Sequence, residues 1–94
     1  NNLLDVGTAD FTLAAWVNPA TVTSAHHMVG KGAISAGGIR YVIALNNSCN
    51  SVSRSVRFEV DDNTTERNVC SAASLTLNAW NHVAMARTGN TIRV

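Results

Sequence analysis

The sequence predicts an all-β protein, an antiparallel β-sandwich, and three observations support this prediction. Short segments alternate apolar and polar residues with a period of two, which is the pattern of a half-buried strand. Gly, Asn, Asp and Pro separate these segments, as turns between antiparallel strands require. No stretch combines the apolar spacing of an amphipathic helix with capping residues at its ends, so we expect essentially no helix.

The first predicted strand, Phe11–Val17, alternates large apolar side chains with smaller or polar ones along most of its length. Asn18-Pro19 ends it, because proline has no backbone N–H to donate to a neighbouring strand. A shorter strand is predicted around Met28-Val29, closed by Gly30-Lys31-Gly32. Gly37-Gly38 then supplies a turn before the next strand.

The second long strand is predicted over residues 40–45. It is almost wholly apolar, which is typical of a strand covered on both faces. Residues 46–53 predict a polar loop, and residues 55–60 predict a strand with the cleanest alternation in the chain. This alternation directs three apolar side chains inward and two charged ones outward, namely Val56, Phe58 and Val60, and Arg57 and Glu59.

The last part of the chain predicts a turn and three more strands. Asp61-Asp62-Asn63 has the chemistry of a turn, since short Asx side chains can bond to their own backbone. Residues 65–71 are expected to return antiparallel to the preceding strand. After a polar stretch, residues 80–87 predict a strand, Gly89-Asn90 a turn, and residues 91–94 the beginning of one more strand.

Length and composition limit the possible classes of protein. The 94 residues suffice for one domain at most, so residues 1–94 are expected to form a single domain. The apolar fraction of 46% with 14% charged residues is that of a folded chain. A formal net charge of +1 provides no field for nucleic acid, and no apolar run approaches the roughly 20 residues of a membrane-spanning helix.

Two cysteines, Cys49 and Cys70, lie in polar surroundings and favour a disulfide, although two free thiols in a reducing compartment fit the same residues. If the strands at 40–45, 55–60 and 65–71 form a meander, both cysteines fall at the same edge of it. Cys49 would then sit in a loop that folds over the intervening strand. Such a bridge contributes on the order of 3 kcal/mol.

Four segments in order resemble one family of β-sandwiches. Asp10–Pro19 is similar to the opening strand of laminin G-like and concanavalin A-like lectin/glucanase domains, in which a Phe-Thr pair precedes a Trp and a polar-Pro stop. Val29–Gly32 resembles the short second strand with its Lys-Gly ending, and Leu77–Ala84 resembles the segment that ends in His-Val-Ala. Arg87–Val94 is similar to the following hairpin.

This resemblance implies a two-sheet jelly roll of an extracellular protein, either secreted or on the cell surface. Members bind glycans or proteins, many with a calcium ion at the rim of the sandwich. Because the family domain is longer than this chain, the resemblance implies a domain truncated at its C-terminus. Further chain, or another copy as in a homo-oligomer, is then expected to complete it.

The first functional hypothesis is a non-catalytic recognition module for glycan or protein, with ligand contacts from loops at one rim. The sequence shows no paired carboxylates placed by a motif, no Gly-x-Ser-x-Gly elbow and no supported Cys-His dyad, so we expect no enzyme activity. Two alternatives remain: a structural β module that self-assembles with neighbouring chains, and an accessory domain of a secreted glycosidase whose catalytic residues lie elsewhere.

Asp61, Asp62 and Asn63 are the candidate calcium ligands, because they offer hard oxygen atoms in one turn. A plain hairpin turn is the competing interpretation. Asp5 and Asp10 are alternative oxygen donors near the start of the chain. A calcium site needs ligands from more than one loop.

Trp16 and Trp80 could stack on a sugar ring, but their motif positions favour packing in the core or between sheets. His82 follows Trp80 by two residues and is predicted to share its face. We therefore expect His82 to be buried and hydrogen-bonded rather than to act as a base or ligand.

Overall fold

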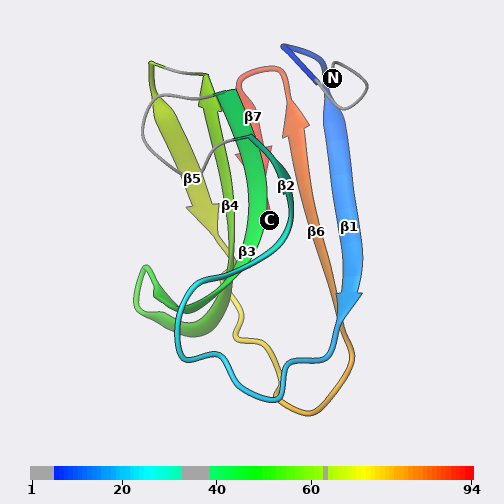
Figure 1. Ribbon diagram of the computed structural model, residues 1–94, viewed down its shortest axis with the longest axis vertical. Helices are drawn as coiled ribbons and strands as arrows, with labels where there is room; N and C mark the ends of the chain where they lie inside the picture. Colours follow the sequence, from blue (N-terminus) through cyan, green and yellow to red (C-terminus); the bar gives the residue numbers. More distant parts are fainter. Residues whose placement is uncertain (1–5, 33–38, 63) are drawn as a thin grey trace.

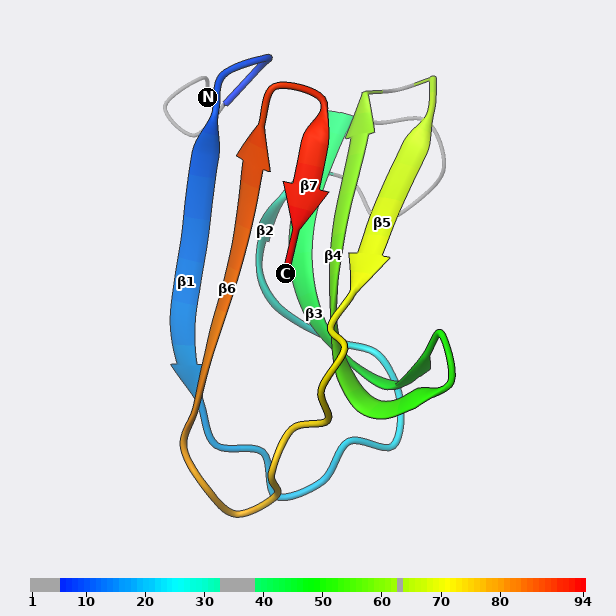
Figure 2. The same ribbon diagram turned by 180° about the vertical axis from the view of Figure 1, so that it is seen from behind.

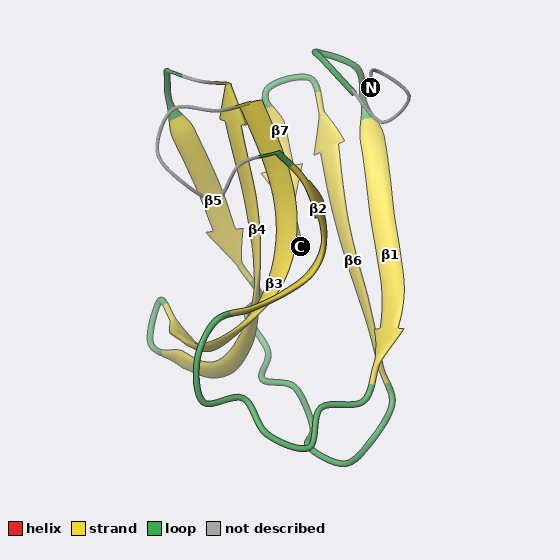
Figure 3. Ribbon diagram, in the orientation of Figure 1, coloured by secondary structure: helices red, strands yellow, loops and turns green. Residues whose placement is uncertain are grey.

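The computed structural model describes residues 6–32, 39–62 and 64–94, and all regular structure in these ranges is β-strand (Figure 3). In chain order the strands are β1 (Phe11–Val17), β2 (His26–Lys31), β3 (Ile39–Cys49), β4 (Val52–Asp62), β5 (Glu66–Cys70), β6 (Asn81–Thr88) and β7 (Thr91–Arg93). No helix in the described ranges is long and apolar enough to span a membrane.

The strands form two antiparallel sheets that face each other. One sheet has the order β1-β6-β7 and the other the order β2-β3-β4-β5. Figure 1 and the reverse view in Figure 2 show the two sheets as separate layers, with β1, β6 and β7 on one side of the core. The predicted antiparallel β-sandwich is confirmed, and so is the meander of β3, β4 and β5.

The core lies between the two layers and is built from alternate residues of the strands. Phe58 and Ile43 contribute from the larger sheet and Met85 from the smaller one, and all three are fully buried. The rings of Phe11 and Phe58 meet edge to face across the core, with centroids 6.1 Å apart. Val56 and Val60 also pack in this cluster, so the predicted inward face of β4 is confirmed.

β3 is buried on its outer face as well as on its inner face. Val42 and Ala44, which alternate with the core residues of this strand, are buried. This confirms the prediction that the strand is covered on both faces. Glu59 of β4 lies on the same outer surface. It is nevertheless buried, with a residue exposure of 4%.

The structure corrects the predicted loop at residues 46–53. β3 continues to Cys49 and β4 begins at Val52, so only Asn50 and Ser51 form the turn. Both have positive φ angles, 51° and 68°. Two positive φ angles are what a tight hairpin turn of type I′ requires, and Asn tolerates this conformation better than most residues. The polar composition of residues 46–53 predicts a loop, but these residues form the end of β3, a two-residue turn and the start of β4.

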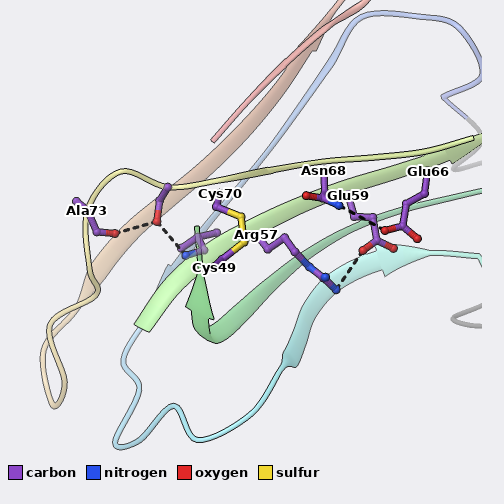
Figure 4. The surroundings of a disulfide bond; sticks show 9 residues. Cys49, Arg57, Glu59, Glu66, Asn68, Cys70 and Ala73 are labelled. Atoms are coloured by element: carbon purple, nitrogen blue, oxygen red, sulfur yellow. Dashed lines mark hydrogen bonds and ion pairs between the residues drawn. A yellow bond between two sulfur atoms is a disulfide. The ribbon is translucent and has the colours of Figure 1, made fainter. Parts of the chain in front are cut away.

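The predicted disulfide between Cys49 and Cys70 is present, and the two Cα atoms are 5.9 Å apart (Figure 4). Cys49 belongs to the end of β3, in a hairpin that bends toward β5, and not to a loop that folds over β4. Arg57 of β4 is the register partner of Cys70. The bridge therefore fastens the bent β3–β4 hairpin to the edge strand β5.

The predicted packing of Trp16 and Trp80 and the predicted burial of His82 are wrong. The two indoles are 65% and 68% exposed, and His82 is exposed as well. The reason lies in the alternation of β1, whose inward positions are occupied by Phe11 and by three smaller residues, Leu13, Ala15 and Val17. Trp16 falls on the opposite face by parity.

Candidate functional site: a rim pocket between the sheets

A hollow of about 900 Å³ opens between the two sheets at one end of the sandwich, and we call it the rim pocket. Its lining residues include the starts of β3, β5 and β7 and the ends of β4 and β6. These strand ends lie together at the top of Figure 1. The size of the rim pocket is typical of sites for small molecules. The lining residues are Val6, Gly7, Thr8, Phe11, Lys31, Arg40, Tyr41, Val60, Asp61, Thr65, Arg67, Asn68, Arg87, Asn90 and Ile92.

The floor of the rim pocket is apolar and partly aromatic. Phe11 from β1 and Tyr41 from β3 contact each other across the two sheets, with ring centroids 5.4 Å apart and planes inclined by 52°. Val60 of β4 lies beside Tyr41 in register, and Ile92 of β7 belongs to the partly buried residues around the core. The floor is therefore an extension of the hydrophobic core that remains open to solvent.

Two arginines of the rim pocket occupy inward positions of their strands. Arg67 of β5 is the register partner of Val60, and Arg87 of β6 is the register partner of Phe11. Directly opposed residues of antiparallel strands share a face, so both arginines share the face of a core residue. They come from different sheets, and both line the same hollow.

Arg87 is fixed by backbone carbonyl groups. Its Nη1 donates to the carbonyl oxygen of Gly7 at 2.7 Å, and its Nε donates to that of Gly89 at 3.1 Å. The backbone N–H of Gly89 in turn donates to Asp10 Oδ1 at 2.7 Å. These bonds connect the segment before β1 to the β6–β7 turn and hold the guanidinium group in place.

Arg67 is exposed and weakly held. Its Nη1 donates to the carbonyl oxygen of Glu66 at 3.4 Å, which is a long hydrogen bond. Within the described ranges, neither Arg67 nor Arg87 forms an ion pair with a carboxylate. The rim pocket thus presents two guanidinium groups whose charge is not neutralised by a described neighbour.

Arg40 is different, because its charge is balanced. Its Nε donates to Glu59 Oε1 at 2.6 Å, and its Nη2 lies 2.7 Å from Glu66 Oε2. Its Nη1 is 3.6 Å from Asp61 Oδ2. Burial alone would lower the pKa of Arg40, but the hydrogen bond to Glu59 and the nearby carboxylates raise it above its ordinary value. Arg40 is permanently charged and serves to neutralise this acidic cluster.

The predicted calcium ligands are only partly described. Asp61 lines the rim pocket and pairs with Arg40, whereas the Asp62 side chain and Asn63 lie outside the described part of the chain, as does Asp5. No group of three or more His, Cys, Asp or Glu side chains in the described ranges is placed to hold a metal ion. The calcium site at 61–63 therefore stays a prediction.

The sequence reasoning missed Arg67 and Arg87. A signal for both was present, because each arginine shares its alternation parity with core residues of the same strand. Arg67 is two residues from Val69, and Arg87 is two residues from Met85. An arginine that continues a row of core residues to the end of a strand is directed toward the rim of the sandwich.

The two-layer antiparallel sandwich with a ligand-sized hollow at its rim defines an antiparallel β-sandwich domain. The chain matches, over residues 1–94, the family described as the Concanavalin A-like lectin/glucanases superfamily, and it belongs to that family. No curated protein and no solved structure matches the chain. The family includes lectins and glucanases, so membership alone does not decide between binding and catalysis.

Proposed function

We propose that the chain is a non-catalytic recognition module that binds a carbohydrate in the rim pocket. The observation that supports this most directly is the composition of the pocket. Its floor offers Phe11 and Tyr41 to the apolar face of a sugar ring, and its lining includes the polar residues Thr8 and Asn90, which can bond to hydroxyl groups. The lectin-containing family makes carbohydrate the favoured class of ligand.

The carboxylate content of the described pocket lining favours binding over hydrolysis. A glycosidase typically places two carboxyl groups on either side of the scissile bond. Among the described residues that line the rim pocket, Asp61 is the one carboxylate, and it is paired with Arg40. A single carboxylate engaged in an ion pair does not provide the two groups that such hydrolysis requires.

The proposed compartment is extracellular, either secreted or at the cell surface. The disulfide between Cys49 and Cys70 supports this proposal, because such bonds persist in oxidising compartments. Calcium is a further proposal: Asp61, one of the candidate ligands, lines the pocket, so an ion that it bound would lie at the edge of the ligand site.

A glycan array tests the proposed function when it is combined with a variant that fills the pocket. Thr8 is an exposed lining residue, whereas Thr12 is exposed on the outer side of β1 and does not line the pocket. Thr8→Trp should abolish glycan binding, and the matched control Thr12→Trp should retain it. The array is read with calcium and with a chelator, and thermal unfolding establishes that each variant is folded.

Two results of this experiment would contradict the proposal. If the folded wild-type chain bound no glycan in either buffer, carbohydrate recognition would be wrong. If Thr8→Trp bound the same glycans as the wild type, the ligand would lie somewhere other than the rim pocket. Binding lost only in the chelator would support the calcium proposal.

Self-association is a second candidate function, favoured by the exposed indoles of Trp16 and Trp80. Large aromatic side chains are among the residues enriched where proteins meet. Light scattering over a range of concentrations distinguishes the two candidates. A monomer at all concentrations would contradict self-association and leave carbohydrate binding untouched.

A further inference from the structure

We infer that the carbohydrate bound in the rim pocket carries an acidic group, a carboxylate or a sulfate, which is held by the guanidinium groups of Arg67 and Arg87. This inference rests on the proposed function, since it names the class of glycan that the same pocket takes.

Arg67 and Arg87 have the inward parity of their strands, at the open end of the space between the sheets. Strand alternation usually gives such positions to hydrophobic residues. Arg67 and Arg87 nevertheless share the faces of Val60 and Phe11, one in each sheet. Two cationic side chains therefore border the same hollow from opposite layers.

Arg67 and Arg87 also differ from two other arginines in having no carboxylate partner in the described part of the chain. The arginines on the outer face of the larger sheet are paired: Arg40 contacts Glu59, and Arg57 Nη2 lies 3.1 Å from Glu59 Oε2 (Figure 4). Neither Arg67 nor Arg87 has such a carboxylate partner among the described residues. Their charge is left available to an anion that enters from solvent.

Both guanidinium groups keep N–H donors that no described residue uses. Arg87 uses Nε and Nη1 for two carbonyl groups, and its Nη2 makes no hydrogen bond to a described residue. Arg67 uses only Nη1, in one long bond. Guanidinium N–H groups match the oxygen spacing of a carboxylate or a sulfate, and charge-assisted bonds of this kind are about twice as strong as neutral ones.

The balance of charge in the pocket points in the same direction. Arg40 and Asp61 line the pocket but are paired with each other, and Glu59 and Glu66 also pair with Arg40. The positive charge that no described carboxylate pairs comes from Arg67 and Arg87. An anionic ligand is attracted to these guanidinium groups, and a neutral ligand gains no such attraction.

The apolar floor distinguishes an acidic sugar from a simple inorganic anion. Phe11 and Tyr41 line the same pocket as the arginines and provide a surface for the C–H face of a ring. A free sulfate or phosphate ion would use the guanidinium groups but not this floor. A sugar with an acidic substituent uses both, which favours it as the occupant.

The test is an array that carries each glycan backbone in a neutral, a carboxylated and a sulfated form. The wild type is compared with Arg67→Gln and with Arg93→Gln, a matched control in which an exposed arginine outside the pocket loses the same charge. We expect binding to acidic forms, a loss of about tenfold or more in affinity for Arg67→Gln, and no loss for Arg93→Gln. Binding should also weaken as salt rises.

Each result decides one of the two proposals. Equal or better binding to the neutral forms would overturn the acidic-ligand inference and leave carbohydrate recognition standing. Acidic binding reduced equally by Arg67→Gln and Arg93→Gln would also overturn it, since general charge would then suffice. No binding to any form by the folded wild type would overturn the proposed function itself.

Discussion

Trp16 of β1 and His82 of β6 contact each other in a tilted arrangement on the outer surface of the smaller sheet. Their ring centroids are 5.0 Å apart, with planes inclined by 56°, and the two residues are direct partners in the strand register. Trp16 is 65% exposed, so most of its indole faces solvent. The contact is a cross-strand pair of the surface and not a part of the core.

Trp16→Ala should therefore destabilise the protein only slightly, by less than about 1.5 kcal/mol, which is the range of a single aromatic contact. Phe58→Ala removes a fully buried ring and should cost about 3 to 5 kcal/mol. Urea unfolding of both variants measures the difference. A cost for Trp16→Ala as large as that for Phe58→Ala would show that the indole is buried in solution.

Much of the fold could be predicted from the sequence because alternation and turn residues report directly on local geometry. Val56, Phe58 and Val60 alternate so clearly that the inward face of β4 follows from the sequence. Gly89-Asn90 marks the β6–β7 turn by composition alone, and Gly89 does adopt a positive φ of 55°. These features depend on neighbours within a few residues.

The errors have different causes. The motif predicts an interior position for Trp16, but Trp16 has the opposite parity to the core residues Phe11 and Leu13 and therefore lies outside. Polar residues occur in tight hairpin turns and in longer loops alike, so the composition around Asn50-Ser51 does not distinguish a hairpin from a loop. The rim pocket could not be predicted at all, since it forms only when Arg67 and Arg87, from different sheets, are brought together.

Removal of the disulfide should cost about 3 kcal/mol, the value that chain entropy gives for a bridge across 21 residues. The double variant Cys49→Ala/Cys70→Ala should unfold at a lower urea concentration than the oxidised wild type. A reducing agent should shift the wild type to the same value and leave the double variant unchanged. If the reducing agent left the wild type unchanged too, the bridge would be absent or would not contribute to stability.

Arg40→Met should destabilise the protein by about 3 kcal/mol, because it removes the main partner of a buried carboxylate. The side chains of Arg40 and Glu59 are 9% and 5% exposed, so Glu59 cannot recover its hydration without local opening. Arg57 alone would remain beside it, 3.1 Å from Oε2. Urea unfolding at neutral pH measures this loss.

Glu66→Gln is the matched control for the Arg40 cluster. Glu66 contacts the same guanidinium group at 2.7 Å, but its side chain is 43% exposed. The ion pair is screened by water, so the variant should lose less than about 1 kcal/mol. A larger loss than for Arg40→Met would contradict the assignment of Glu59 as the principal partner.

Gly30→Ala should destabilise the protein by about 2 kcal/mol, as overpacking at a close backbone contact does. A Cβ atom at this position would lie 2.7 Å from the carbonyl oxygen of Tyr41 and 3.1 Å from the Cα atom of Val42. Both neighbours are backbone atoms of β3, so β2 and β3 would have to move apart. Val29→Ala, at an exposed neighbouring position, should cost less than about 1 kcal/mol.

Because Tyr41 forms part of the floor of the rim pocket, Gly30→Ala should also weaken glycan binding, whereas Val29→Ala should not. Equal unfolding midpoints for the two variants would show that β2 does not approach β3 this closely.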